Sequence, residues 1–336
     1  MATMLDVAKK ANVSLSTVSY AISGTRPISE ETRQRIFKAM EELNYRPHPL
    51  ARGLASKRSR ILAILFPAIE RGLGLTELEF VANAAEAASK SGYHLVLWSA
   101  ETNDPEELRQ LTQQGLVDGV ILMEIHKNDR RVNLLRQLDF PFSMIGRYDD
   151  DSGEYVDIDF HQTIDEIMTY LLNLGHKNIA FFNQSKSSFE AGYGPVVRTK
   201  AAFEDFVRKS GINGYTVFCR PSPQSGYEKI NALMGEHPDI TAVVSMNERA
   251  IPGIMRAAAE HGWKVPGDLS IAAIVSSVKM AEMMVPRLTT MDPPSAELGR
   301  IATELLIKSL EGNCDESPHI LIPCRLDVGE STGPAA

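Results

Sequence analysis

Apolar residues recur every three or four positions over residues 4–46, and this spacing predicts three short amphipathic helices. Ser14 and Ser29 stand where helix N-caps are expected, and Gly24 and Pro47 stand where the second and third helices would end. Two helices joined by a tight turn and supported by a third are typical of a helix-turn-helix unit. Its predicted core is Leu5, Val7, Ala8, Ala11, Val13, Val18, Ala21, Ile22, Ile36, Ala39, Met40 and Leu43.

The second predicted helix carries an outward face of small hydroxyl side chains and one aromatic ring. Its outward positions are Leu15, Ser16, Ser19 and Tyr20, with Thr17 beside them. In a helix-turn-helix unit the second helix enters the major groove, where hydroxyls can bond to either base edge or to phosphate. DNA binding is therefore one interpretation. A three-helix module that binds protein is the alternative on this pattern alone.

From Ile61 onward the pattern changes to short apolar runs that alternate with helical stretches. The runs are ILAILF (61–66), YHLVLW (93–98), DGVILM (118–123), FSMIG (142–146), YVDID (155–159), NIAFF (178–182), TVFC (216–219), AVVSM (242–246) and SIAAI (270–274). Nearly continuous apolar strands between helices favour parallel sheets covered on both faces. Two sets of such units, before and after about residue 160, predict an α/β core of two similar subdomains.

Charge is distributed unevenly over a chain whose net charge is −8. The first 60 residues hold 11 lysines and arginines against 5 acidic residues, whereas the remainder holds 24 against 38. A basic head on an acidic body indicates a polyanionic partner at one end only. Between them, PHPLARGLASKRSR (47–60) is too short to form a stable helix alone. It is either a segment that orders on docking or a plain flexible linker.

Several classes of protein find little support in the sequence. No apolar run approaches a membrane span, the N-terminus lacks the apolar segment of a secretory signal, and three scattered cysteines fit a reducing compartment. A cytoplasmic protein without membrane contact is expected. No phosphate-binding loop or nucleophile–histidine constellation argues for an enzyme, and none points to a cofactor. His161 and His176 are isolated, so no metal site is predicted.

The opening LDVAKKANVSLSTVSYAISG, followed by ISEETRQRIFKAMEELNYRPHPLARGLAS, closely resembles the LacI/GalR (lac repressor) family of transcriptional regulators. The resemblance extends over essentially the whole chain through LVDGVILM, LGHKNIAFF, AVVSMNERAIPGIMRAAAEHGWKVPGDLSI, PRLTTMDPPSAELGRIATELL and the final EST. It implies a helix-turn-helix head, a hinge helix, and a core like that of periplasmic binding proteins, which binds a small effector between its subdomains.

The resemblance also implies residues for DNA contact. Leu15, Ser16 and Tyr20 would read bases, while Thr17, Ser19 and Arg33 would contact phosphate. The hinge adds Arg52, Leu54 and Ala55, with Leu54 as a wedge in the minor groove. Ala55 stands where some relatives have lysine, which removes one contact. Members of the family bind as homodimers to near-palindromic double-stranded operators, and the absence of C-terminal leucine heptads favours a dimer over a tetramer.

Domain limits follow from the same resemblance. The head is expected at 1–47 and the hinge at 48–59. The N-terminal core subdomain is expected at 60–160 and about 288–320, and the C-terminal one at 161–287 and about 321–332.

For the effector, the resemblance implies contacts from Arg147, Gln162, Arg198 and Asn247. Trp98 is a substitute for an aromatic that the family usually places where Pro221 stands here. A partly buried core residue is the alternative for Trp98, a surface ion pair for Arg198 and a simple helix cap for Asn247. Val275 occupies a position that is often a ligand-binding aspartate.

The expected function is a repressor released from its operator by a small polar effector, a sugar or oligosaccharide. A regulator without an effector and a solute-binding protein are the alternatives.

Overall fold

The N-terminal head contains three helices in the computed structural model, which describes residues 2–23, 26–45, 58–66, 74–98, 105–149, 153–312 and 318–336. They are α1 (Met4–Ala11), α2 (Leu15–Ser23) and α3 (Glu30–Glu42). Both predicted caps are confirmed: the hydroxyl of Ser14 accepts from the Thr17 amide at 3.1 Å, and that of Ser29 from the Thr32 amide at 3.3 Å. The polar turns therefore set where α2 and α3 begin.

The head has a small hydrophobic core of its own. Its buried members are Val7, Ala8, Ala11, Val18, Ala21, Ile36, Ala39 and Met40. Leu5 was wrongly predicted to join them, since it is 51% exposed. At about 100° per residue, Leu5 lies roughly 110° around α1 from the centre of the face formed by Val7, Ala8 and Ala11. Met4 instead packs against that face.

Two six-stranded sheets form the rest of the chain. The first, in the order β11-β5-β4-β3-β1-β2, contains β1 (Ile61–Leu65), β2 (His94–Trp98), β3 (Gly119–Met123), β4 (Phe142–Ile145), β5 (Tyr155–Ile158) and β11 (His319–Ile322). The second, in the order β12-β10-β9-β8-β6-β7, contains β6 (Asn178–Asn183), β7 (Asn213–Phe218), β8 (Ala242–Ser245), β9 (Ser270–Ile274), β10 (Thr289–Asp292) and β12 (Arg325–Asp327). All pairings are parallel except that of β12 with β10. The prediction of parallel sheets in two similar units is confirmed.

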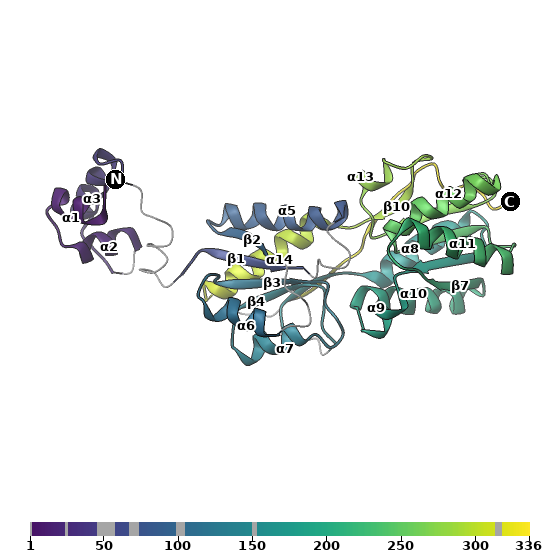
Figure 1. The fold of residues 1–336 in the computed structure, drawn as a ribbon, viewed down its shortest axis with the longest axis horizontal. Coiled ribbons are helices and arrows are strands. Elements are labelled where there is room, and N and C mark those ends of the chain that lie inside the picture. Colours follow the sequence, from purple (N-terminus) through teal and green to yellow (C-terminus); the bar gives the residue numbers. More distant parts are fainter. Residues whose placement is uncertain are drawn as a thin grey trace.

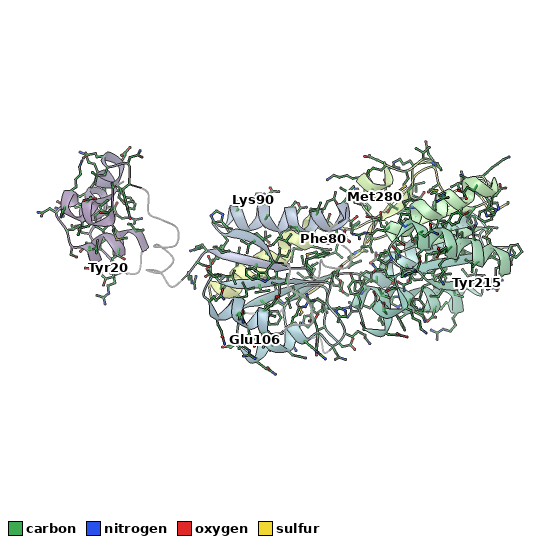
Figure 2. The ribbon with its side chains drawn as sticks, in the orientation of Figure 1. Tyr20, Phe80, Lys90, Glu106, Tyr215 and Met280 are labelled. Carbon is green, nitrogen blue, oxygen red and sulfur yellow. The ribbon has the colours of Figure 1, made fainter. Side chains whose placement is uncertain are left out.

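Helices cover both faces of each sheet (Figure 1). The first sheet lies between α5 (Leu75–Lys90) with α14 (Ser295–Leu310) and α6 (Pro105–Gln113) with α7 (Arg130–Gln137). The second lies between α8 (Phe160–Asn173) with α10 (Gly194–Ser210) and α11 (Pro223–Glu236) with α12 (Ile251–His261). Shorter elements are α9 (Lys186–Glu190), η1 (Glu248–Ala250) and α13 (Val278–Ala281). On α5, Phe80 is buried against the core while Lys90 pairs with Glu86 in solvent (Figure 2).

The chain crosses between the two sheets three times: after β5, after β10 and after β11. The boundary predicted near residue 288 lies one strand too early, because β10 pairs with β9 and belongs to the second sheet. Its sequence TTMD offers few apolar side chains, so the strand gave little signal. Likewise β11 extends to Ile322, beyond the boundary predicted near 320.

The described residues contain neither a membrane-spanning helix nor a cluster of metal ligands. No helix among them is both long and apolar enough to cross a bilayer. Nor do those residues hold any group of histidine, cysteine and carboxylate side chains that could bind a metal ion. His176 is buried and bonds to Thr241 and to the Gly333 carbonyl, which is a structural role.

Candidate functional site

The exposed surface of α2 consists of hydroxyls and apolar atoms without an acidic group. Leu15 is 47% exposed and Ser16 is exposed beside it, while Ser19 and Tyr20 are half-buried one turn later. Val18 and Ala21, on the opposite face, are buried against α1 and α3. Packing of the apolar face therefore fixes which side chains α2 presents outward.

Hydroxyl bonds and cation–ring contacts organise this surface. The Ser14 hydroxyl lies 2.7 Å from those of both Ser16 and Thr17. The Arg26 guanidinium lies 5.2 Å from the centre of the Tyr20 ring. On α3, Arg33 lies 5.7 Å from the ring of Phe37. The predicted contacts Arg52, Leu54 and Ala55 lie outside the described residues.

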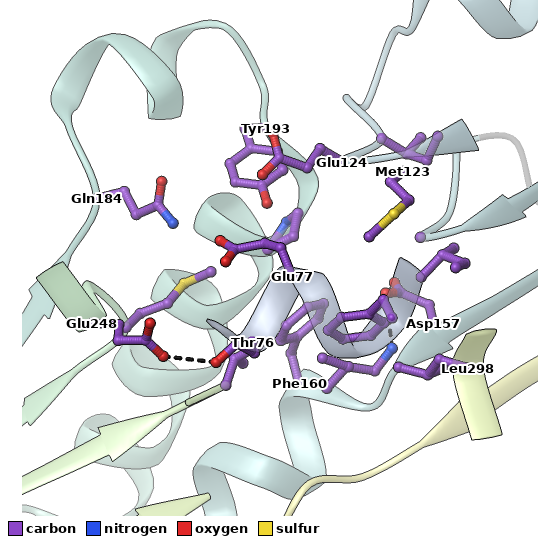
Figure 3. A pocket seen from close by; sticks show the side chains of 18 of the residues that line it. Thr76, Glu77, Met123, Glu124, Asp157, Phe160, Gln184, Tyr193, Glu248 and Leu298 are labelled. Atoms are coloured by element: carbon purple, nitrogen blue, oxygen red, sulfur yellow. Dashed lines mark hydrogen bonds between the residues drawn. The ribbon is translucent and has the colours of Figure 1, made fainter. Parts of the chain in front are cut away.

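A cavity opens between the two sheets, with about 970 Å³ of space that includes part open to solvent. Residues from both subdomains line it (Figure 3). They are Phe66, Thr76, Glu77, Phe80, Met123, Glu124, Ile125, Ile145, Gly146, Asp157, Ile158, Phe160, Gln184, Tyr193, Pro195, Pro221, Met246, Asn247, Glu248, Arg249, Val275 and Leu298. A mostly apolar wall with a few polar groups is typical of sites for small molecules.

A hydrogen-bonded clasp joins the subdomains at the edge of this cavity. The Thr76 hydroxyl, at the start of α5, donates to Glu248 Oε2 at 2.7 Å and accepts from the Ser277 amide at 3.1 Å. Ser276 donates to the same oxygen of Glu248 at 2.8 Å. Burial raises the pKa of Glu248, and the two hydroxyl donors oppose that rise. Any change in the angle between the subdomains must break or stretch the bond from Thr76.

Asp157, in the middle of β5, is a carboxylate inside an otherwise apolar strand and is 4% exposed. Its Oδ1 accepts from the Ile158 amide, while its Oδ2 has no hydrogen-bond partner among the described residues. The nearest cations to Oδ2 are Arg147 Nε at 3.6 Å and Arg198 Nη1 at 3.9 Å. Burial raises the pKa of Asp157 to about 6, although both arginines lower it.

The residues predicted to bind effector fall into two groups. Asn247 and Val275 line the cavity, as does Pro221. The Asn247 side chain donates to the Cys219 carbonyl at 2.8 Å, and Val275 adopts the left-handed backbone region with φ 54°. That region is strained for a β-branched residue.

The other four predicted residues are not among the described residues that line the cavity. Arg198 donates to the Arg147 carbonyl at 2.8 Å, and both arginines lie behind Asp157. Gln162 is exposed at the start of α8, where its backbone N–H donates to the Asp159 side chain. Trp98 ends the edge strand β2 and packs partly buried against the core under α6 and α7.

Sequence reasoning missed three carboxylates of the cavity. Glu77, Glu124 and Asp157 line it together with Glu248, although each comes from a different segment. Asp157 alone left a signal that could have been noticed, because a charged residue in the middle of a buried strand requires a partner.

A helix-turn-helix head, joined to a two-sheet core with a ligand-sized cavity between its sheets, defines the class of ligand-responsive DNA-binding transcriptional regulators. The family models agree with this architecture. "Bacterial regulatory proteins, lacI family" matches residues 3–48, and "Periplasmic binding protein-like domain" matches residues 168–332. The resemblance to the LacI family that the motifs predicted is confirmed, and the chain is a DNA-binding transcriptional regulator.

Curated relatives match along the whole chain. Catabolite control protein A of Priestia megaterium is 27% identical over 98% of this chain and 99% of its own. Its counterpart in Staphylococcus epidermidis is 28% identical with the same coverage.

Among solved structures, the lac repressor dimer bound to operator and an anti-inducer aligns with a TM-score of 0.82 at 23% identity, over 99% of both chains. A complex of the transcriptional regulator CelR with cellobiose aligns with a TM-score of 0.74 at 24% identity, over 98% of this chain and 100% of that one. These structures support the fold.

Proposed function

We propose that this protein is a repressor that leaves its operator when a small polar effector, a sugar or oligosaccharide, binds between the two sheets. The observation that carries the proposal is the cavity itself, whose wall is shared by both subdomains and bordered by the Thr76–Glu248 bond. A ligand that contacts both subdomains changes the relative free energies of conformations that differ in the angle between them. Such a difference is sufficient to couple effector binding to DNA binding. The CelR–cellobiose complex supports a sugar in this fold.

For the DNA side, we propose Leu15, Ser16 and Tyr20 as base contacts and Thr17, Ser19 and Arg33 as phosphate contacts. Their support is the exposed, carboxylate-free face of α2 and the basic charge of the head. The hinge residues Arg52, Leu54 and Ala55 are added from the sequence alone. Such a protein acts where the DNA is, so we place it in the cytoplasm.

For the effector side, we propose that Asn247 and Val275 contact the ligand directly. Four further residues reach the ligand when the subdomains change their angle. They are Arg147, Arg198, Gln162 and Trp98. We also propose the domain limits predicted from the sequence, except that β10 joins the C-terminal subdomain and all of β11 joins the N-terminal one.

A homodimer is the proposed assembly. Large apolar side chains are exposed at Leu78 on α5 and Leu97 on β2, and at Met283 and Val285 after α13, the last being 93% exposed. Since α13 contacts α5, these side chains lie on neighbouring elements, as Figure 1 also shows. Burial against a second copy would remove them from water.

The test is selection of bound duplexes from a random pool with the full-length protein, followed by anisotropy titration of the selected operator in the presence of sugars. A near-palindromic consensus and its release by a sugar are expected. A protein that prefers no duplex would contradict the proposal. One that binds an operator but responds to no small molecule would be a regulator without an effector.

A further inference from the structure

The described wall of the cavity carries more negative than positive groups. Its ionisable carboxylates are Glu77, Glu124, Asp157 and Glu248, and its one described cation is Arg249. Arg147 and Arg198 do not line the described wall, and both lie against the Asp157 carboxylate, whose charge they offset. Figure 3 shows these four carboxylates around the same space. A ligand with a phosphate or carboxylate group would add negative charge at short range in a partly desolvated site, which is unfavourable.

Asp157 provides a second, independent observation about this wall. The residue lines the cavity, and its buried Oδ2 accepts no hydrogen bond from a described donor. The two arginines behind it approach only to 3.6 and 3.9 Å. A buried carboxylate oxygen ordinarily accepts a hydrogen bond. A donor on the ligand at this point would satisfy Oδ2.

Glu77 and Glu248 come from opposite subdomains and act on each other across the cavity. Glu77 stands in the first turn of α5, where its Oε2 accepts from the Gly74 amide at 2.9 Å. Glu248 opens η1 of the second subdomain. The negative charge of Glu77 contributes to the raised pKa of Glu248. Two carboxylates that repel each other are stabilised by a cation placed between them.

We propose that the effector carries a protonated amino group and is an amino sugar or a short amino-sugar oligosaccharide. Its ammonium lies between the Glu77 and Glu248 carboxylates, and another of its donors reaches Asp157. The inference rests on the proposed function, because it gives the chemical class of the ligand for the same cavity. It also supplies the coupling, since a cation that contacts one carboxylate from each subdomain favours one particular angle between them.

The experiment measures binding of matched sugars to the full-length protein by isothermal titration calorimetry. The members of each set share one sugar skeleton and differ in the group at C2, or in a phosphate at C6. The disaccharide set is deacetylated chitobiose, its N-acetylated form and cellobiose. Glucosamine and galactosamine are each compared with the N-acetylated, parent and 6-phosphate sugars. A pH of about 6.5 keeps an amine with the pKa of an α-amino group protonated.

In at least one set, the amine should bind about tenfold more tightly than its neutral partners, as a charge-assisted hydrogen bond allows, and the phosphate should bind most weakly. Glu248→Gln and Glu77→Gln should each remove most of that preference, taken as the ratio of the amine's affinity to the neutral partner's affinity for the same variant. Glu86→Gln, on the solvent side of the same helix, should keep it. Two carboxylate variants guard against the failure of either one to fold.

The result that overturns the inference is an amine that binds no better than its neutral partner in every set, whatever else binds. Tightest binding of a phosphorylated sugar overturns it equally. Operator release, followed in parallel, separates this failure from that of the proposed function. If a neutral sugar releases the operator, the proposed function stands and only the amino group is wrong.

Discussion

The head and the cavity are the two surfaces of this protein that face a ligand, and they are built in opposite ways. The head presents hydroxyls from one short helix, α2, without an acidic residue. The cavity gathers carboxylates from segments as distant in sequence as Glu77 and Glu248. The head suits a polyanion, whereas the proposed effector for the cavity is a cation. This separation by charge keeps the nucleic acid and the small ligand from competing for the wrong site.

The largest expected effect tests the head. Replacing Ser16 and Tyr20 together with alanine should weaken operator binding about a hundredfold or more, because each base contact contributes roughly 1–3 kcal/mol. Affinity for random DNA should change little, since phosphate contacts remain. Anisotropy titrations with both duplexes measure this. Ser89→Ala, exposed on α5, is the control. Equal losses on both duplexes would mean that these side chains do not read bases.

A second prediction concerns the buried acid of the cavity. The pKa of Asp157 is about 6 in the folded protein, against 3.8 for an ordinary aspartate, so the folded state holds the proton more tightly. Its contribution to the free energy of unfolding is fully present below about pH 4 and is lost as the pH rises through about 6. The loss amounts to at most about 3 kcal/mol.

Asp157→Asn should remove that dependence on pH, which urea denaturation at several pH values would measure. Asp205→Asn is the matched control. Hydrogen bonding from Lys209 lowers the pKa of Asp205, so its contribution changes with pH in the opposite direction. An unchanged slope in Asp157→Asn would show that this carboxyl keeps an ordinary pKa.

A smaller effect is expected at the clasp between the subdomains. Thr76→Val removes the hydroxyl that donates to Glu248 and accepts from the Ser277 amide, at a cost of about 1 kcal/mol or more, and leaves the Ser276 bond intact. Because the bond joins two subdomains, its loss should change the ligand concentration that releases operator by about fivefold. Thr112→Val, whose hydroxyl bonds only within the α6 segment, should leave that concentration unaltered. Identical shifts in the two variants would exclude a special role for the clasp.

The smallest effect concerns phosphate contact. Arg33→Gln should reduce the slope of log affinity against log salt by about 1 and weaken operator and random DNA alike. Arg256→Gln, at an exposed position on α12 of the second subdomain, should not alter the slope. A loss confined to operator DNA would instead make Arg33 a base contact.

Features that depend on local sequence were predictable. The caps Ser14 and Ser29 follow from residue type and position. The apolar runs from Ile61 to Ile274 all became strands, although only the inner strands are buried on both faces and the edge strands β2 and β7 are partly exposed. Short or polar strands such as β12 and β10 gave no pattern of their own, since neighbours fix them. The residues of the cavity were harder to predict, because groups such as Asp157 and Arg198 come together only after both subdomains have folded.

The three crossings between the sheets determine which fragments of the chain contain a complete subdomain. A fragment that stops after β5 lacks both α14 and β11, so its sheet has an unpaired edge and one face that only α5 still covers. A fragment that begins at α8 carries both of those elements without their partners. Neither half can be produced as one uninterrupted reading frame, and an isolated subdomain would need segments spliced across the gap.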